Sequence, residues 1–68
     1  IIRGMTTTER VRQHCIDTIE KYPSLESEVN ELYYLYRMEI ADDCASEEHE
    51  AELCYGSIEE LIEDLNNE

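Results

Sequence analysis

The chain has 68 residues, and its 18 acidic and five basic side chains give a formal net charge of −13. A chain of this size builds one domain with a small core, which a second copy often completes. The carboxylate excess argues against direct binding to nucleic acid or anionic lipid, and two glycines with one proline are too few for the tight turns of a sheet protein. We therefore expect an all-α fold, a small helical hairpin or three-helix domain completed by homodimerisation.

Residues ahead of Met5 are expected to lie outside the domain. We expect Ile1–Gly4 to be a remnant that precedes a native start at Met5, with residues 5–68 forming a single acidic helical domain. The three cysteines follow no secretory signal segment. No run approaches the ~18 consecutive apolar residues of a membrane-spanning helix. These features predict a cytoplasmic protein with free thiols and no membrane association.

A first helix is predicted from Thr6 to Tyr22. The Thr6 hydroxyl can accept a hydrogen bond from the backbone N–H of Glu9 while the Glu9 carboxylate reaches back, which is the capping-box pattern of a helix start. Tyr22 precedes Pro23, and a residue before proline disfavours helical geometry, so the helix should end there. Its apolar side chains follow the helical period: Val11, Cys15, Ile16, Ile19 and Tyr22.

A second helix is predicted to begin near Leu25, with Ser24 as its N-cap. Glu26 and Glu28 lie in its first turn, where the helix dipole favours carboxylates. One apolar stripe follows the helical period: Leu25, Val29, Leu32, Tyr36 and Ile40. Three further side chains make the apolar zone wider than one packing partner requires: Tyr33, Leu35 and Met38.

The stretch from Leu25 to Tyr55 allows two interpretations. The apolar pattern continues weakly through Ala41, Cys44 and Ala45 and lapses over residues 46–50. It resumes at Ala51, Leu53, Cys54 and Tyr55. Either one long helix has a solvated middle, or Ser46 caps a new helix after a bend.

The last predicted helix follows Gly56. A glycine suits the left-handed position at a helix C-terminus, and Ser57 with Glu60 can form a second capping box. This final segment is amphipathic, and its end at residues 66–68 should fray. Its apolar side chains are Ile58, Leu61, Ile62 and Leu65.

Thiol, imidazole and carboxylate groups occur together in residues 42–54. Cys44 and Cys54 are ten positions apart, whereas zinc ligands usually come in pairs two to four residues apart. The alternating oxygen ligands and central glycine of a calcium loop are missing. We therefore expect no metal, no cofactor and no catalytic residue. The mixed cluster comprises Asp42, Asp43, Cys44, Glu47, Glu48, His49, Glu50 and Cys54.

An enzyme is the disfavoured alternative. Carboxylates are abundant enough for a small acid–base hydrolase, but such chemistry needs a cleft that sets two carboxyl environments apart. We expect the three cysteines to act as small apolar residues, since nothing beside them stabilises a thiolate. The sequence therefore favours a non-enzymatic protein that acts by protein–protein interaction.

Three tyrosines within four residues cannot all face one helix side, so at least one should point away from the core. Tyrosine is enriched at protein interfaces, and a short chain often dimerises. We therefore expect a homodimer or partner surface on the second and last helices. The candidate interface residues are Tyr33, Tyr34, Leu35, Tyr36, Met38, Ile58, Leu61, Ile62 and Leu65.

The negative charge is concentrated beyond residue 22. Residues 1–22 have four basic and three acidic side chains, net +1, so residues 23–68 carry −14. Helical rows of carboxylates could imitate a phosphate backbone and inhibit a DNA-binding protein, which is an alternative function. Two such rows are Asp43, Glu47 and Glu50, and Glu52, Glu59 and Glu63.

The run Met5–Arg12 (MTTTERVR), the Tyr33–Tyr36 patch and the acidic end resemble the small early proteins of lambdoid bacteriophages. These proteins are encoded between the exonuclease and excisionase genes. The resemblance implies a helical, dimeric protein of the host cytoplasm that modulates host growth or the lysis–lysogeny decision through an unidentified host or phage protein. It implies no particular catalytic or binding residue.

Overall fold

The computed structural model of the protein describes residues 4–42 and 46–67. They form α1 (Thr7–Lys21), a 3-10 turn η1 (Pro23–Leu25), α2 (Glu26–Ala41) and α3 (Glu47–Asn66). No strand occurs in these two ranges, so the predicted all-α fold is confirmed. Neither does the described part hold a helix both long and apolar enough to cross a membrane.

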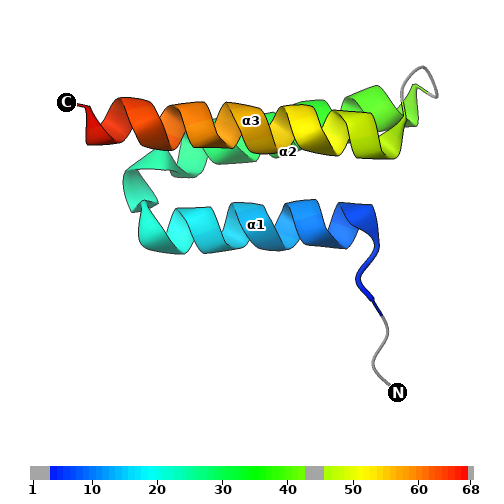
Figure 1. The fold of residues 1–68 in the computed structure, drawn as a ribbon, viewed down its shortest axis with the longest axis horizontal. Coiled ribbons are helices and arrows are strands. Elements are labelled where there is room, and N and C mark those ends of the chain that lie inside the picture. Colours follow the sequence, from blue (N-terminus) through cyan, green and yellow to red (C-terminus); the bar gives the residue numbers. More distant parts are fainter. Residues whose placement is uncertain (1–3, 43–45, 68) are drawn as a thin grey trace.

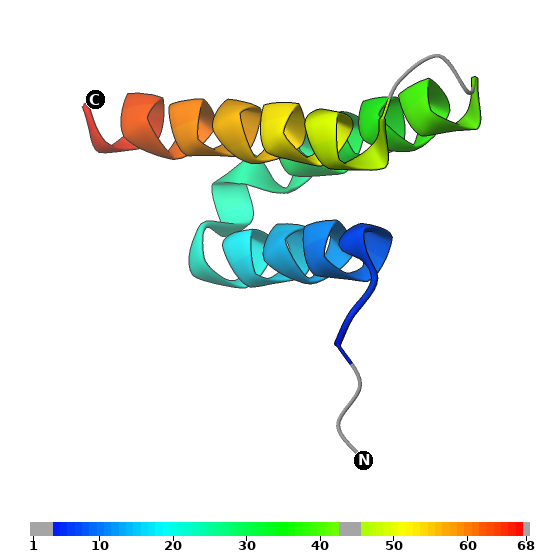
Figure 2. The same ribbon diagram turned by 45° about the vertical axis from the view of Figure 1, so that its right-hand side comes forward.

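The three helices lie along the long axis of the molecule, and each is antiparallel to the one before it. α1 and α3 run in the same direction, and α2 runs in the opposite direction, behind α3 in the view of Figure 1. The turn η1 carries the chain from the end of α1 into α2, as the rotated view shows (Figure 2). Each helix packs against the other two, so the core draws on all three.

The capping box predicted at the start of α1 is present. The Glu9 backbone N–H donates to the Thr6 hydroxyl at 3.1 Å, and the Thr6 backbone N–H donates to the Glu9 carboxylate at 2.9 Å. The hydrogen bonds to Thr6 also lower the pKa of Glu9, since they favour its charged form. The helix ends at Lys21, one residue before the predicted Tyr22.

The predicted N-cap of the second helix is wrong. Ser24 lies exposed within η1, and Leu25 occupies the N-cap position of α2 without any side-chain hydrogen bond. The Leu25 backbone N–H instead donates to the Tyr22 carbonyl at 2.9 Å, and the Leu25 side chain is buried. Pro23, with its fixed φ, opens the turn, so proline geometry and burial of Leu25 fix this junction rather than a serine cap.

Two helices occupy the stretch in which one or two were possible. α2 ends at Ala41, and Ser46 caps α3 by accepting a 3.2 Å hydrogen bond from the His49 backbone N–H. The structure therefore selects the interpretation with a Ser46 cap. The predictions that involve Asp43, Cys44 and Ala45 fall outside the described residues, as do those for residues 1–3 and 68.

Gly56 does not end a helix. α3 continues without interruption from Glu47 to Asn66, so the predicted left-handed glycine and the Ser57 capping box are both wrong. Cys54 and Ile58 are buried on either side of the glycine, and their burial keeps this segment on the helical period. Gly56 itself faces solvent, and a Cβ there would meet nothing within 4 Å.

The core is one cluster shared by all elements. Thr18 is buried with it, and its hydroxyl is satisfied by donating to the His14 carbonyl at 2.8 Å. The apolar pattern alone could not identify this polar core residue. The cluster comprises Val11, Cys15, Leu25, Val29, Tyr36, Ala51, Cys54 and Ile58.

Candidate functional site

An apolar groove lies between the outer sides of α2 and α3. Its volume is about 130 Å³. Pockets that enclose a cofactor or a drug-sized ligand usually measure ~300–1,000 Å³, so this groove suits the side chains of another protein. Its lining is Leu32, Leu35, Tyr36 and Glu39 from α2, and Glu50, Leu53, Cys54 and Ser57 from α3.

The floor and the walls of the groove differ in exposure. Tyr36 and Cys54 are buried beneath it, and the Cys54 thiol donates a weak 3.9 Å hydrogen bond to the Leu32 carbonyl. Leu35 on α2 is 48% exposed and Leu53 on α3 is 52% exposed. The two leucines therefore form opposite walls that leave much of their apolar surface in water.

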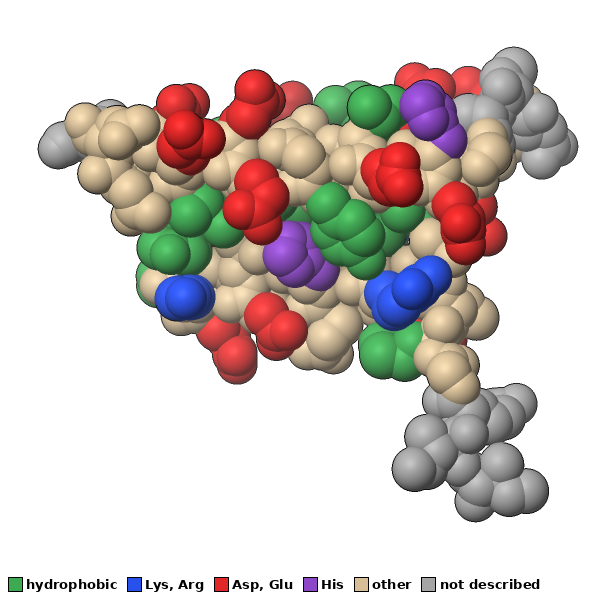
Figure 3. Space-filling view, viewed as in Figure 1, with side chains coloured by type: hydrophobic (Ala, Val, Ile, Leu, Met, Phe, Trp, Pro, Cys, Tyr) green, Lys and Arg blue, Asp and Glu red, His purple; other side chains and the backbone are tan. Residues whose placement is uncertain are grey.

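The exposed apolar surface extends from the groove over α2. Tyr34 is 63% exposed and Met38 is 48% exposed, and the two lie one helical turn apart. In the space-filling view, hydrophobic side chains gather at the upper edge of the molecule near His49, with carboxylates around them (Figure 3). We call this surface the apolar strip; it comprises Tyr34, Leu35, Met38 and Leu53.

Carboxylates border the apolar strip. Glu39 and Glu50 line the groove itself. Beyond Pro23 the sequence has a single lysine or arginine, Arg37, against 15 acidic side chains, which gives that region its net charge of −14. The surface therefore combines an apolar centre with a strongly negative field, which repels acidic partners and attracts basic ones.

The predicted interface residues fall into three groups. Tyr34, Leu35 and Met38 are exposed and belong to the apolar strip. Tyr36 and Ile58 are 2% and 0% exposed, so they are core residues and cannot present themselves to a partner. The remaining four are partly buried against the core: Tyr33, Leu61, Ile62 and Leu65.

Leu53 is a strip residue that the sequence did not single out. It stands between the buried residues Ala51 and Cys54, one position off the apolar stripe of α3. A helix that runs unbroken through Gly56 places Leu53 beside Ser57, four residues on and lining the same groove. A sequence prediction that continued the helix through Gly56 would therefore have placed Leu53 on this groove.

Tyr33 and Tyr36 are engaged within the chain. The Arg12 guanidinium lies over the Tyr33 ring, 5.3 Å from its centroid. The Tyr36 hydroxyl lies 3.3 Å from the Thr8 hydroxyl, whose proton goes to the Glu47 carboxylate at 2.5 Å, so Tyr36 donates to Thr8. Burial raises the pKa of Tyr36 above its usual value. Of the three neighbouring tyrosines, Tyr34 alone is exposed.

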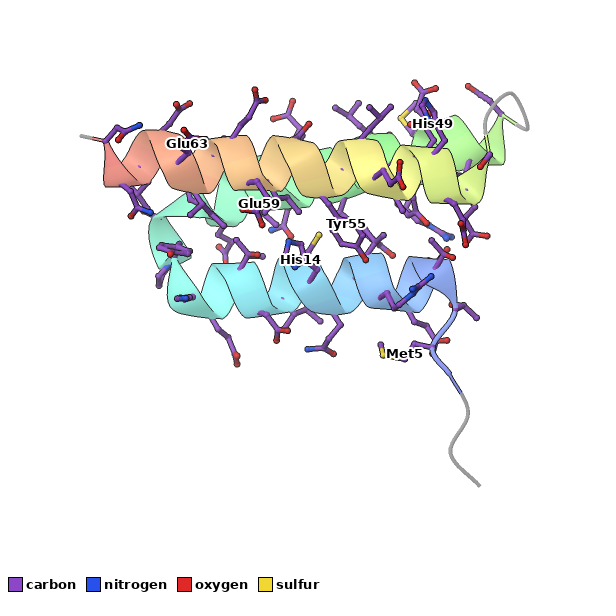
Figure 4. The ribbon with its side chains drawn as sticks, in the orientation of Figure 1. Met5, His14, His49, Tyr55, Glu59 and Glu63 are labelled. Carbon is purple, nitrogen blue, oxygen red and sulfur yellow. The ribbon has the colours of Figure 1, made fainter. Side chains whose placement is uncertain are left out.

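An aromatic pair lies at the boundary between α1 and α3. His14 and Tyr55 point toward each other across it (Figure 4), with ring centroids 4.9 Å apart in an edge-to-face arrangement. The His14 Nε2 atom is buried there and has no hydrogen-bond partner among the described residues. The two rings fill the boundary at this point, and beside Tyr55 a hollow of about 340 Å³ lies between Thr7 and Arg10 of α1 and Glu48, Ala51 and Glu52 of α3.

Cys15 and Cys54 are free, buried thiols that contact each other across α1 and α3. The hydrogen bond that the Cys15 thiol donates to Cys54, together with burial, raises the pKa of Cys15, which keeps it in the unreactive thiol form. Within residues 4–42 and 46–67, no three histidine, cysteine or acidic side chains are placed to hold a metal ion. Of the described members of the predicted mixed cluster, Glu47, Glu48 and His49 are exposed at the start of α3, Asp42 is exposed at the end of α2, and Cys54 is buried in the core.

The groove and its strip are the feature with the clearest capacity to bind a partner. Their walls are exposed leucines, their floor is the core, and their border is negative. Known proteins add no further assignment to this geometry. The chain matches no family model, no curated protein and no solved structure with which it was compared.

Proposed function

We propose that this protein is a non-enzymatic regulatory protein that binds another protein through the acidic surface of α2 and α3. The supporting observation is the apolar strip, where Leu35 and Leu53 leave about half of their surfaces in water. A chain this short depends on nearly every large apolar side chain for its core. Contiguous exposed apolar residues with a polar border are typical of interaction sites.

Apolar and charged groups have different roles in this proposal. Burial of the strip residues supplies binding free energy, at about 25 cal/mol for each Å² of apolar surface removed from water. The carboxylates around them contribute less affinity, but they speed the approach of basic partners and repel acidic ones. The acidic surface thus selects the partner and the strip holds it.

The regulatory setting rests on the resemblance to early proteins of lambdoid phages. In that setting the protein acts in the host cytoplasm and modulates host growth or the lysis–lysogeny decision by occupying a host or phage protein.

Site-specific photo-crosslinking tests the proposal. A photoreactive amino acid replaces Leu35 in one variant and Ile16, an apolar residue of α1 with 39% exposure, in the control. We expect the position 35 probe to capture one discrete protein in bacterial cells and the position 16 probe to capture none. Equal capture from both positions, or none from position 35, would contradict the proposal.

Self-association is a second proposal. Leu61, Ile62 and Leu65 on the last turns of α3 are partly buried in the single chain, and a second copy could cover the rest of their surfaces. Sedimentation at high protein concentration should then give twice the chain mass of 8.0 kDa. A species of single chain mass across the whole concentration range would rule out the homodimer.

Phosphate mimicry is the alternative supported by the carboxylate row of α3. Glu52, Glu59 and Glu63 are exposed on this helix, and the last two are marked in Figure 4. Their spacings of seven and four residues correspond to ~10 and ~6 Å along a helix axis. A partner bound in this way should be displaced by DNA and by salt, whereas a partner held on the apolar strip should resist both.

A further inference from the structure

The α2–α3 pair has two long grooves, and one of them is already filled by a helix. α1 packs against both α2 and α3 from one side. Figures 1 and 2 show no other described element on the opposite side. That side carries the groove walled by Leu35 and Leu53. A helix bound in it would pack against both α2 and α3, as α1 does on the other side, and would complete a four-helix arrangement.

We propose that this groove binds a cationic amphipathic helix of another protein, and this inference rests on the proposed function. The apolar face of that helix lies between Leu35 and Leu53 over the floor formed by Tyr36 and Cys54. Its lysine or arginine side chains face Glu39 and Glu50, which line the same groove. Such helix-in-groove binding uses apolar anchors at positions i, i+3 or i+4, and i+7.

Charge argues for a basic helix rather than a second copy of this chain. Residues 23–68 carry −14, and Glu39 and Glu50 line the groove, so two copies that meet at this groove would bring like charges together. The nearly neutral α1 of a second copy is no substitute, because Val11 and Cys15 on its apolar face are buried in its own core. A basic helix gains from the same field that repels a copy.

The groove also limits the length of the contact. Its lining covers Leu32–Glu39 on α2 and Glu50–Ser57 on α3, two turns of each helix. The occupant therefore needs two or three apolar side chains over about two turns. Tyr34 and Met38, next to the α2 wall, extend the apolar contact on one side.

The test uses a designed helical peptide of about four turns as the probe, with leucine at i, i+3, i+4 and i+7 and lysine at the other positions. One matched peptide has glutamate in place of lysine, and another has the same composition with the leucine spacing scrambled. Calorimetry measures affinity at low and high salt. Backbone amide shifts in NMR spectra locate the site. We expect binding of the lysine peptide alone, with shifts confined to the Leu32–Glu39 and Glu50–Ser57 ranges.

Protein variants separate the groove from general charge attraction. Leu53→Asp should weaken binding about tenfold or more, since it places a charge against the apolar face, whereas Ile16→Asp on α1 should leave it unchanged. Glu39→Gln and Glu50→Gln should each weaken binding about 1.5- to 5-fold at low salt. The matched Glu20→Gln should have no effect. Circular dichroism confirms that every variant keeps its helices.

The outcomes distinguish this inference from the proposed function. Equal losses in the groove variants and their controls, or binding of the glutamate peptide, would show that the groove does not select a cationic helix. If the position 35 probe captures a partner but the lysine peptide does not bind, the proposed function stands, and the proposal that the groove binds a cationic helix is wrong. Crosslinking of position 35 to a second copy of this chain would also overturn it.

Discussion

The two sides of α3 show how one small helical core can be closed on one side and left open on the other. Toward α1, Tyr55 meets His14 edge to face, and another helix of the same chain packs against α3. Toward the outer side of α2, Leu53 and Leu35 stand apart with about half of each surface in water. The closed side contributes to folding, whereas the open side retains apolar surface whose burial can contribute to binding.

The largest expected effect separates core from strip. Ile58→Ala should lower the free energy of unfolding by about 2–5 kcal/mol, because Ile58 is fully buried and its truncation leaves a cavity. Leu53→Ala should cost less than about 1 kcal/mol, since half of that side chain is exposed. Urea unfolding followed by circular dichroism measures both. Equal losses would erase the distinction between the closed and open sides of α3.

A middle-sized effect concerns the helix caps. Thr6→Ala should cost about 1 kcal/mol, because it removes one half of the capping box of α1. Ser46→Ala should cost a similar amount at the start of α3, where its hydroxyl accepts from the His49 backbone N–H. Ser24→Ala is the control, since Ser24 makes no cap, and its unfolding midpoint should not move. A clear loss in the Ser24 variant would contradict the junction described for η1.

A stabilising change is expected within α3 itself. Gly56→Ala should raise the free energy of unfolding by about 0.5–1 kcal/mol, since glycine is a poor helix former and the added Cβ meets nothing within 4 Å. Thermal unfolding of the two proteins provides the measurement. Destabilisation of the variant would contradict the placement of Gly56 as an exposed residue within a regular helix.

The smallest effect is a pH dependence of stability at Tyr36, which lies beneath the groove and contacts Thr8 of α1. Burial raises the pKa of Tyr36 in the folded state, so its contribution to stability is complete below the usual tyrosine pKa and declines as pH rises through the folded value. Tyr36→Phe has no ionisable group there. We expect the difference in stability between the two proteins to shift in favour of the variant above about pH 10. A constant difference from pH 8 to pH 11 would contradict this assignment.

Local signals in the sequence were sufficient for much of the fold. The Thr6 and Glu9 pair predicted the start of α1, and Pro23 predicted its end within one residue, because both act through neighbouring backbone atoms. A new helix capped by Ser46 was one of the two interpretations that the sequence left open. Ser24 and Gly56 failed for the opposite reason, since the burial of Leu25 and Ile58 by distant parts of the chain overrides their local preferences.

The candidate site was predictable in part. Tyr34, Leu35 and Met38 were assigned to a partner surface because they exceed the apolar width that α2 needs. Tyr36 was assigned with them, although the helical period already placed it on the stripe with Val29, and that stripe is the buried one. Whether a tyrosine on such a stripe is covered depends on what packs over it, here Thr8 of α1, and spacing along α2 says nothing about that neighbour.

The short turn η1 has a consequence for the order in which this chain acquires structure. Four residues, Tyr22 and the three of η1, connect α1 to α2, so the two helices can meet with little loss of loop entropy. Their shared core nevertheless lacks Ala51, Cys54 and Ile58 until α3 arrives. During synthesis the first two helices should therefore form only a transient hairpin, and native structure should appear in one cooperative step once the C-terminal third has left the ribosome.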